Sequence, residues 1–99
     1  MATPESLTKK KVVKLLEQYA IYHFFPAANG YGRAGIPDII CCHAGWFLAI
    51  ECKSATGRTT ALQDRELQRI CDAGGEALVV YDTPESFTKL NQLLKDYTA

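Results

Sequence analysis

The sequence predicts a mixed α/β domain whose elements follow in the order α-β-β-β-α-β-α. Thr-Pro-Glu occurs near each end, at residues 3–5 and 83–85, and apolar residues at helical spacing follow both times, which predicts two helices. Two apolar runs flank Ala44-Gly45 and predict a β-hairpin. A helical pattern and a short apolar run at residues 77–81 predict a helix and a strand after the hairpin. We therefore expect a small mixed sheet flanked by helices.

The first helix is expected to run from about residue 4 to residue 22. Thr3 can cap it by accepting a hydrogen bond from the first turn, and Pro4 occupies the first helical position, where its missing N–H costs nothing. Helical spacing is set by Val12, Val13, Leu16, Tyr19 and Ala20. Aromatic residues at 22–28 are expected to hold a short strand, and residues 29–35 form a glycine-rich loop.

Residues 36–43 and 46–53 are expected to form the two hairpin strands. After a polar loop, Thr60 and Gln63 match a capping box and begin a helix that stops at Gly74-Gly75. The strand at 77–81 leads to the last helix. The apolar stripe of that helix consists of Phe87, Leu90, Leu94 and Tyr97.

Length and composition limit the possible classes of protein. Residues 1–99 are enough for a single domain, and 47% hydrophobic with 22% charged residues is typical of a globular fold. No apolar run reaches membrane-spanning length and no secretory signal opens the chain, so we expect a cytoplasmic protein without a membrane partner. The four cysteines lack zinc-site spacing and are expected to be buried free thiols. Residues 1–58 are net basic and residues 59–99 net acidic, although the whole chain has a net charge of zero.

The hairpin predicts an acidic pair. If Ala44-Gly45 is a two-residue turn, Asp38 lies across from Glu51, and Lys53 lies on the same face. Because opposed carboxylates repel each other, we expect a shared proton, the Lys53 ammonium or a divalent cation to compensate. With the main-chain carbonyl of Cys52, the oxygens would suit Mg²⁺ or Mn²⁺, which can activate water for phosphodiester hydrolysis. The alternative is a surface aspartate and an ordinary Glu–Lys pair.

The same residues carry a family resemblance. Pro37-Asp38 and Glu51-Cys52-Lys53 resemble the PD-(D/E)xK nuclease signature. Together with Gly35, Arg58 and Gln63, the pattern resembles the virus-type replication-repair nuclease (VRR-NUC) family over nearly the whole chain. The resemblance implies a restriction-endonuclease-like core and an endodeoxyribonuclease that depends on Mg²⁺ or Mn²⁺. It further implies DNA repair in a bacterial or phage-infected cell.

The resemblance also implies roles for individual residues. Asp38 and Glu51 would be metal ligands together with the main-chain carbonyl of Cys52, and Lys53 would be the catalytic lysine. Gln63 matches a family glutamine near the site, although it could serve only as a helix cap.

An acid in the first helix is also expected from the family, and Glu5 fits this place better than Glu17. For DNA contact, Arg33 and Arg58 are expected in loops beside the site. A lysine run could add further contacts to the DNA backbone or simply be a solvated helix face; it consists of Lys9, Lys10 and Lys11.

The resemblance favours a structure-selective endonuclease. Short stand-alone family members resemble homodimeric Holliday junction resolvases, so we expect a homodimer that acts on branched or four-way DNA. Two alternatives remain open. One is a non-catalytic DNA-binding or assembly module with the nuclease fold, and the other is a flap-cutting or restriction-type nuclease of the same superfamily.

Overall fold

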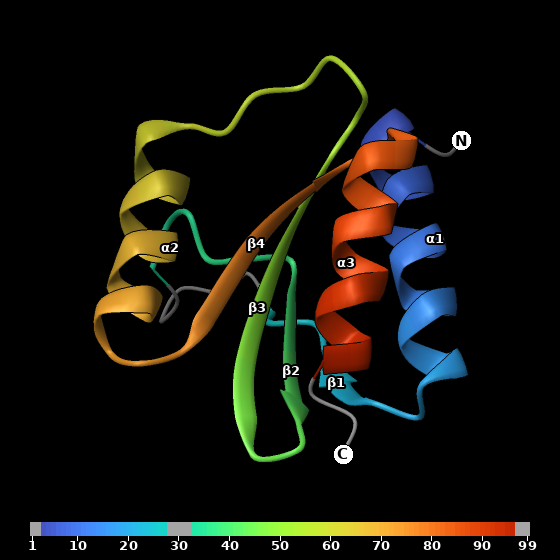
Figure 1. Ribbon diagram of the computed structural model, residues 1–99. Coiled ribbons are helices and arrows are strands. Elements are labelled where there is room, and N and C mark those ends of the chain that lie inside the picture. Colours follow the sequence, from blue (N-terminus) through green and yellow to red (C-terminus); the bar gives the residue numbers. More distant parts are fainter. Residues whose placement is uncertain (1–2, 28–32, 97–99) are drawn as a thin grey trace.

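The computed structural model describes residues 3–27 and 33–96 as a four-stranded sheet with helices on both faces (Figure 1). The mixed α/β class and the predicted order of elements are confirmed. The elements are α1 (Pro4–Gln18), β1 (Tyr22–Phe24), β2 (Ile39–His43), β3 (Trp46–Lys53), α2 (Ala61–Asp72), β4 (Glu76–Tyr81) and α3 (Pro84–Asp96). Within the described ranges, no helix is long and apolar enough to cross a bilayer.

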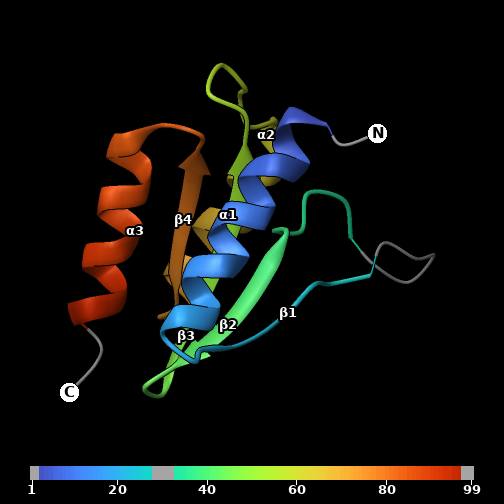
Figure 2. The ribbon, with the colours of Figure 1, turned by 90° about the vertical axis from the view of Figure 1, so that its right-hand side faces the viewer.

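The strand order β1-β2-β3-β4 follows the chain. The first three strands pair antiparallel. Strands β3 and β4 pair parallel, because α2 carries the chain back to the end of the sheet where β3 begins. Helix α2 covers one face, and α1 and α3 cover the other (Figure 1). On that second face α1 packs against β3 and α3 against β4 (Figure 2).

The predicted hairpin register is confirmed. His43 pairs with Trp46 and Ile39 with Ile50, so the turn holds two residues. Ala44 and Gly45 both have positive φ angles, 51° and 82°. Positive φ at both central residues is the backbone that matches the twist of two antiparallel strands. The last pair of this register, Ile39 with Ile50, brings Asp38 and Glu51 next to each other at the open end of the hairpin.

The hydrophobic core lies between the sheet and the α1–α3 layer. Alternate residues of β3, namely Leu48, Ile50 and Cys52, are buried there beside the facing residues of β2. Leu90 and Leu94 of α3 are fully buried on the same core, so most of the predicted α3 stripe packs on its own sheet. Helix α1 adds Val12 and Leu16 to the core, β4 adds Val80, and the partly buried Phe87 packs against it.

Helix α1 ends earlier than predicted, at Gln18 rather than near residue 22. Ala20 adopts a φ of 55°, and the N–H of Ile21 reaches back to the carbonyl of Leu16. This left-handed residue closes the helix, a conformation that glycine usually provides. The short strand expected within residues 22–28 is confirmed as β1, which ends at Phe24.

Strand β2 begins at Ile39 rather than at residue 36. Pro37 is buried in the segment before it and has no N–H with which to extend the ladder. Of the cysteines, Cys41 and Cys52 are buried as predicted, whereas Cys42 and Cys71 are exposed. The predicted loop at 29–32 and Tyr97 lie outside the described residues.

Candidate active site

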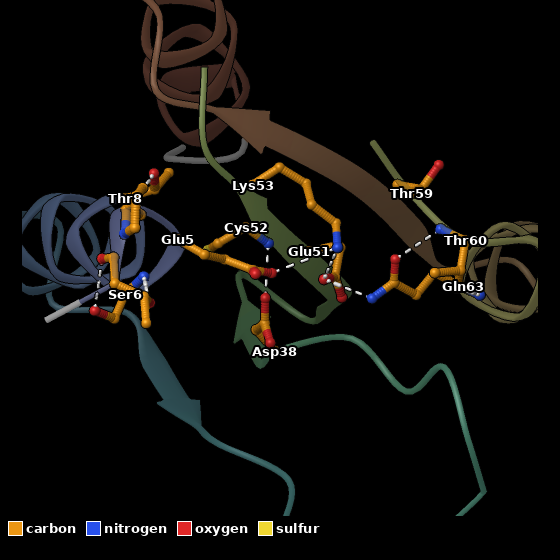
Figure 3. Close-up of polar contacts among 12 residues, drawn as sticks. Glu5, Ser6, Thr8, Asp38, Glu51, Cys52, Lys53, Thr59, Thr60 and Gln63 are labelled. Carbon is orange, nitrogen blue, oxygen red and sulfur yellow. Dashed lines mark hydrogen bonds and ion pairs between the residues drawn. The ribbon is translucent and has the colours of Figure 1, made fainter. Parts of the chain in front are cut away.

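Because β2 begins only at Ile39, Asp38 lies just before this strand and beside the end of β3. There the Asp38 side chain takes the place of a strand partner, because its Oδ2 accepts a hydrogen bond from the N–H of Cys52 at 2.8 Å (Figure 3). Glu51 precedes Cys52 and is 1% exposed, on the face opposite the core. The sequence therefore brings the two predicted acids together, although Asp38 lies just outside the strand.

A third carboxylate comes from the first turn of α1. One oxygen each from Glu5, Asp38 and Glu51 lie within 4.8 Å of one another. Glu17 is on the same helix but twelve residues further along, roughly 18 Å away at 1.5 Å per residue. Three converging carboxylate oxygens are the ligands that hard divalent cations prefer.

Lys53 lies between two of these acids. Its Nζ is 3.4 Å from Oε1 of Glu5 and 3.5 Å from Oε2 of Glu51. Burial lowers the pKa of Lys53, but the two carboxylates outweigh this effect and raise the pKa above its ordinary value. The side chain is therefore a fixed ammonium ion at neutral pH and not a general base.

The pKa of Glu51 is raised from its ordinary value to about 7. Burial is the largest cause, the charge of Asp38 adds to the rise, and Lys53 opposes it. Its Oε1 is also buried without a hydrogen-bond partner among the described residues. An unpartnered carboxylate oxygen inside an acidic cluster is costly unless it gains a proton or a cation. The residues present therefore fit a divalent metal.

Gln63 has both of the functions considered from the sequence. At the start of α2 it completes the capping box with Thr60. Its Nε2 also donates a hydrogen bond to Oε2 of Glu51 at 3.1 Å. Through these two contacts, Gln63 connects the start of α2 to Glu51 on β3.

Gly35 allows the segment that leads to Asp38 to pack closely on α2. Its φ is 83°, and a Cβ atom there would lie 2.6 Å from the carbonyl carbon and oxygen of Leu62. Only glycine accepts both this conformation and this approach without displacement.

The fold that carries these site residues is similar to that of known proteins. A family model described as "Archaeal holliday junction resolvase (hjc)" matches residues 8–94. This chain belongs to the archaeal Holliday junction resolvase (Hjc) family. The Hjc family consists of nucleases of the PD-(D/E)xK type, so the predicted superfamily is confirmed at this coarser level.

One solved structure shows the same fold as this Hjc family member. It is the Hjc of Archaeoglobus fulgidus, described as a Holliday junction resolvase from an archaeal hyperthermophile. The identity is 22%, the TM-score is 0.61, and the match covers 80% of this chain and 69% of that one. No curated protein matches this chain.

The predicted DNA contacts of this Hjc family member lie in different environments. Arg58 is exposed in the loop after β3. Arg33 has an exposed side chain, but its Nε is bound to Oε1 of the buried Glu66 at 3.0 Å. The lysine run does not form one basic patch, because successive residues point about 100° apart around a helix. Lys9 lies over the Phe25 ring, Lys10 is exposed, and Lys11 pairs with Asp82 at 2.8 Å.

Sequence reasoning missed Glu66. It is 4% exposed and holds Arg33 at 3.0 Å and Arg69 at 3.4 Å, so it ties the segment before Asp38 to α2. Glu66 follows Gln63 by three residues and therefore lies on the same side of α2. This spacing of three residues was the sequence signal that could have placed Glu66 on the side of α2 that faces the site.

Proposed function

We propose that this chain is a divalent-metal-dependent endonuclease that cuts four-way DNA junctions as a homodimer. The observation that supports it best is the convergence of three carboxylates on one lysine in a member of a junction-resolvase family. Membership of the VRR-NUC family and a single stand-alone domain remain predictions.

Asp38, Glu51 and Glu5 would hold the cation, with the main-chain carbonyl of Cys52 as a further oxygen ligand. When bound, Mg²⁺ or Mn²⁺ polarises phosphate oxygen and lowers the pKa of water. The unpartnered Oε1 of Glu51 supports this assignment, because a cation would satisfy it and release its proton.

Lys53 would stabilise the negative charge that develops on the phosphate. Its ammonium is held between Glu5 and Glu51, so its position is set before DNA arrives and little reorganisation is needed in the transition state. An arginine should not replace it fully, because the guanidinium is broader and would not fit between the two acids.

DNA would approach the end of β3 from the side where Glu5 is exposed and Asp38 is half-buried. Arg58 keeps an exposed side chain for the phosphate backbone, whereas Arg33 also lines the groove beside α2 and would reach DNA only from its edge. Lys9 and Lys10 would add weaker contacts, and Lys11 the weakest because Asp82 already neutralises it. These contacts to phosphate position DNA without reading its sequence, which fits selection by shape.

A homodimer would place two sites on one junction. Helix α3 is not a good interface, since Leu90 and Leu94 are buried against its own sheet. The other face of the sheet is more suitable: a groove of about 570 Å³ lies there beside α2. Apolar residues line much of it, and Phe47 is 46% exposed. A second copy covering this face would bury the apolar residues of the groove, with Arg33 among the charged residues that also line it.

A cleavage panel tests the proposal. Duplex, single-stranded, flap and four-way-junction DNA are each incubated with wild type and Lys53→Ala, with Mg²⁺ or Mn²⁺ or with a chelator. We expect paired nicks in the junction only with metal, and a much slower chemical step in Lys53→Ala with junction affinity retained. Light scattering should give about twice the chain mass. Junction binding without cleavage would favour the non-catalytic module, and cleavage confined to flaps by a monomer would favour the flap nuclease.

A further inference from the structure

The start of α2 holds the Gln63 side chain by two hydrogen bonds to one residue. Thr60 Oγ1 accepts a hydrogen bond from the main-chain N–H of Gln63 at 3.2 Å, and the N–H of Thr60 donates to Oε1 of Gln63 at 2.9 Å (Figure 3). This reciprocal arrangement satisfies two N–H groups that the helix end would otherwise leave unpaired. It also determines which way the amide points.

An amide side chain has one accepting end and one donating end. Because Oε1 of Gln63 is occupied by the N–H of Thr60, Nε2 lies on the other side, where it donates to Oε2 of Glu51 at 3.1 Å. The reversed amide would set Nε2 against an N–H and Oε1 against a carboxylate, so both contacts would be repulsive. One orientation alone satisfies both neighbours.

We propose that Thr60 is a positioning residue for the active site: its capping box orients the Gln63 amide so that Nε2 holds the Glu51 carboxylate in place. The inference rests on the proposed function for its consequence in catalysis, but the hydrogen-bond geometry can be tested without cleavage. Oε2 of Glu51 is thereby held both by Lys53 and by the start of α2, which leaves Oε1 without a partner among the described residues.

The first turn of α2 has little freedom to move away from this position. Gly35 packs against the peptide that joins Leu62 and Gln63, close enough that a Cβ atom would come within 2.6 Å of it. Because the Thr60 hydroxyl bonds to the N–H of this fixed peptide, its loss would let the Thr60 main chain move away, and the N–H of Thr60 would then lose its bond to Oε1 of Gln63.

Three variants separate positioning from simple helix stability. Thr60→Val removes the accepting hydroxyl at constant size, and Thr60→Ser restores it. Thr59→Val is the matched control, because Thr59 Oγ1 donates to Oδ1 of Asp64 at 2.6 Å at the same helix end without contacting Gln63. Both valine variants should lower the melting temperature similarly. Only Thr60→Val should lower kcat for a four-way junction, by about tenfold or more with KM little changed, and Thr60→Ser should recover it.

Gln63→Glu sharpens the test. Glutamate at this position keeps a capping box, since its carboxylate can still accept from the N–H of Thr60. It cannot donate to Glu51 and places a second negative charge beside it. We expect the helix to remain intact while kcat falls by about 10²-fold.

A readout without DNA completes the design. In ¹⁵N-labelled wild type, the Gln63 side-chain amide should give a resonance shifted by its bond to Glu51, and Thr60→Val should lose that shift while Thr59→Val keeps it. This result supports the positioning role even if no variant cuts any DNA, a case in which only the proposed function fails. Retention of the shift in Thr60→Val, or an equal loss of kcat in both valine variants, would overturn the inference.

Discussion

The two faces of strand β3 differ sharply in chemistry although their residues alternate along one chain. On the α1–α3 side, Leu48, Ile50 and Cys52 are almost fully buried in a continuous apolar core. On the α2 side, Glu51 and Lys53 are also buried, but among charges and with one carboxylate oxygen unpartnered. Because side chains alternate between the two faces of a strand, neighbouring residues of β3 contribute either to the apolar core or to the candidate active site.

This comparison teaches where the protein can tolerate strain. A well-packed face supplies the free energy of folding, and the opposite face can then keep an acidic cluster that reduces it. Changes on the first face should therefore lower stability with little specific effect on chemistry. Changes on the second face should reduce cleavage without lowering the stability of the metal-free fold.

The largest expected effect is on the α2 side. Asp38→Asn should reduce junction cleavage by about 10³-fold or more, because it removes a metal ligand from the proposed centre. The melting temperature should not fall in parallel. Cleavage assays on purified protein measure the effect, and near-wild-type cleavage would remove Asp38 from the chemistry.

Next comes the core side. Ile50→Ala should lower the free energy of unfolding by about 3 kcal/mol, because the residue is fully buried and its loss leaves a cavity. Urea denaturation measures this change. Below the onset of unfolding, the cleavage rate should stay near that of wild type; a loss comparable to that of Asp38→Asn would break the division between the faces.

A smaller effect is expected at the third acid. Glu5→Gln should slow cleavage by about 10- to 10²-fold, since it removes one carboxylate and one partner of Lys53. Glu17→Gln is the matched control on the same helix and should cleave normally. Equal behaviour of the two variants would exclude Glu5 from the site.

The pH dependence of stability tests the charged face without DNA. The Glu51 pKa is about 7 in the fold against an ordinary 4.5, so the folded chain keeps a proton that the unfolded chain releases between these values. The stabilising contribution is complete below pH 4.5 and is lost as the pH rises through about 7. Calorimetry on metal-free protein should show this decline in wild type, and Glu51→Gln should lack that part of it.

The smallest effect is expected at the hairpin turn that sets the register of both faces. Ala44→Asn should raise stability by about 1 kcal/mol, because asparagine tolerates the positive φ found there better than alanine. Thermal unfolding measures it. Junction cleavage should be unchanged, and a drop would mean that the turn does more than fix the register.

The pairing of the acids could be predicted from sequence because it depends on local rules. A two-residue turn at Ala44-Gly45 and strand alternation together place Asp38 near Glu51. The capping box at Thr60 and Gln63 was likewise readable from four neighbouring residues. What remained open was the role of Gln63, which depends on where α2 packs.

Features that rest on tertiary contacts could not be predicted in this way. The early end of α1 depends on Ala20 in a left-handed conformation that alanine disfavours, so no local signal marked it. The partners of Arg33 and Lys11, Glu66 and Asp82, lie 33 and 71 residues away along the chain. The start of β2 at Ile39 differs from these cases, because a local signal for it was present: Pro37 has no N–H for the strand ladder, so a start after it could have been predicted.

One measurement tests most directly whether the acidic face is kept for a cation. The free energy of unfolding of wild type and Glu51→Gln is measured at about pH 8, above the Glu51 pKa, with Mn²⁺ and with a chelator. The account predicts a reversal: the variant is the more stable protein without metal, and wild type is the more stable with it. Equal stabilisation of both proteins by Mn²⁺, or none of either, would contradict it.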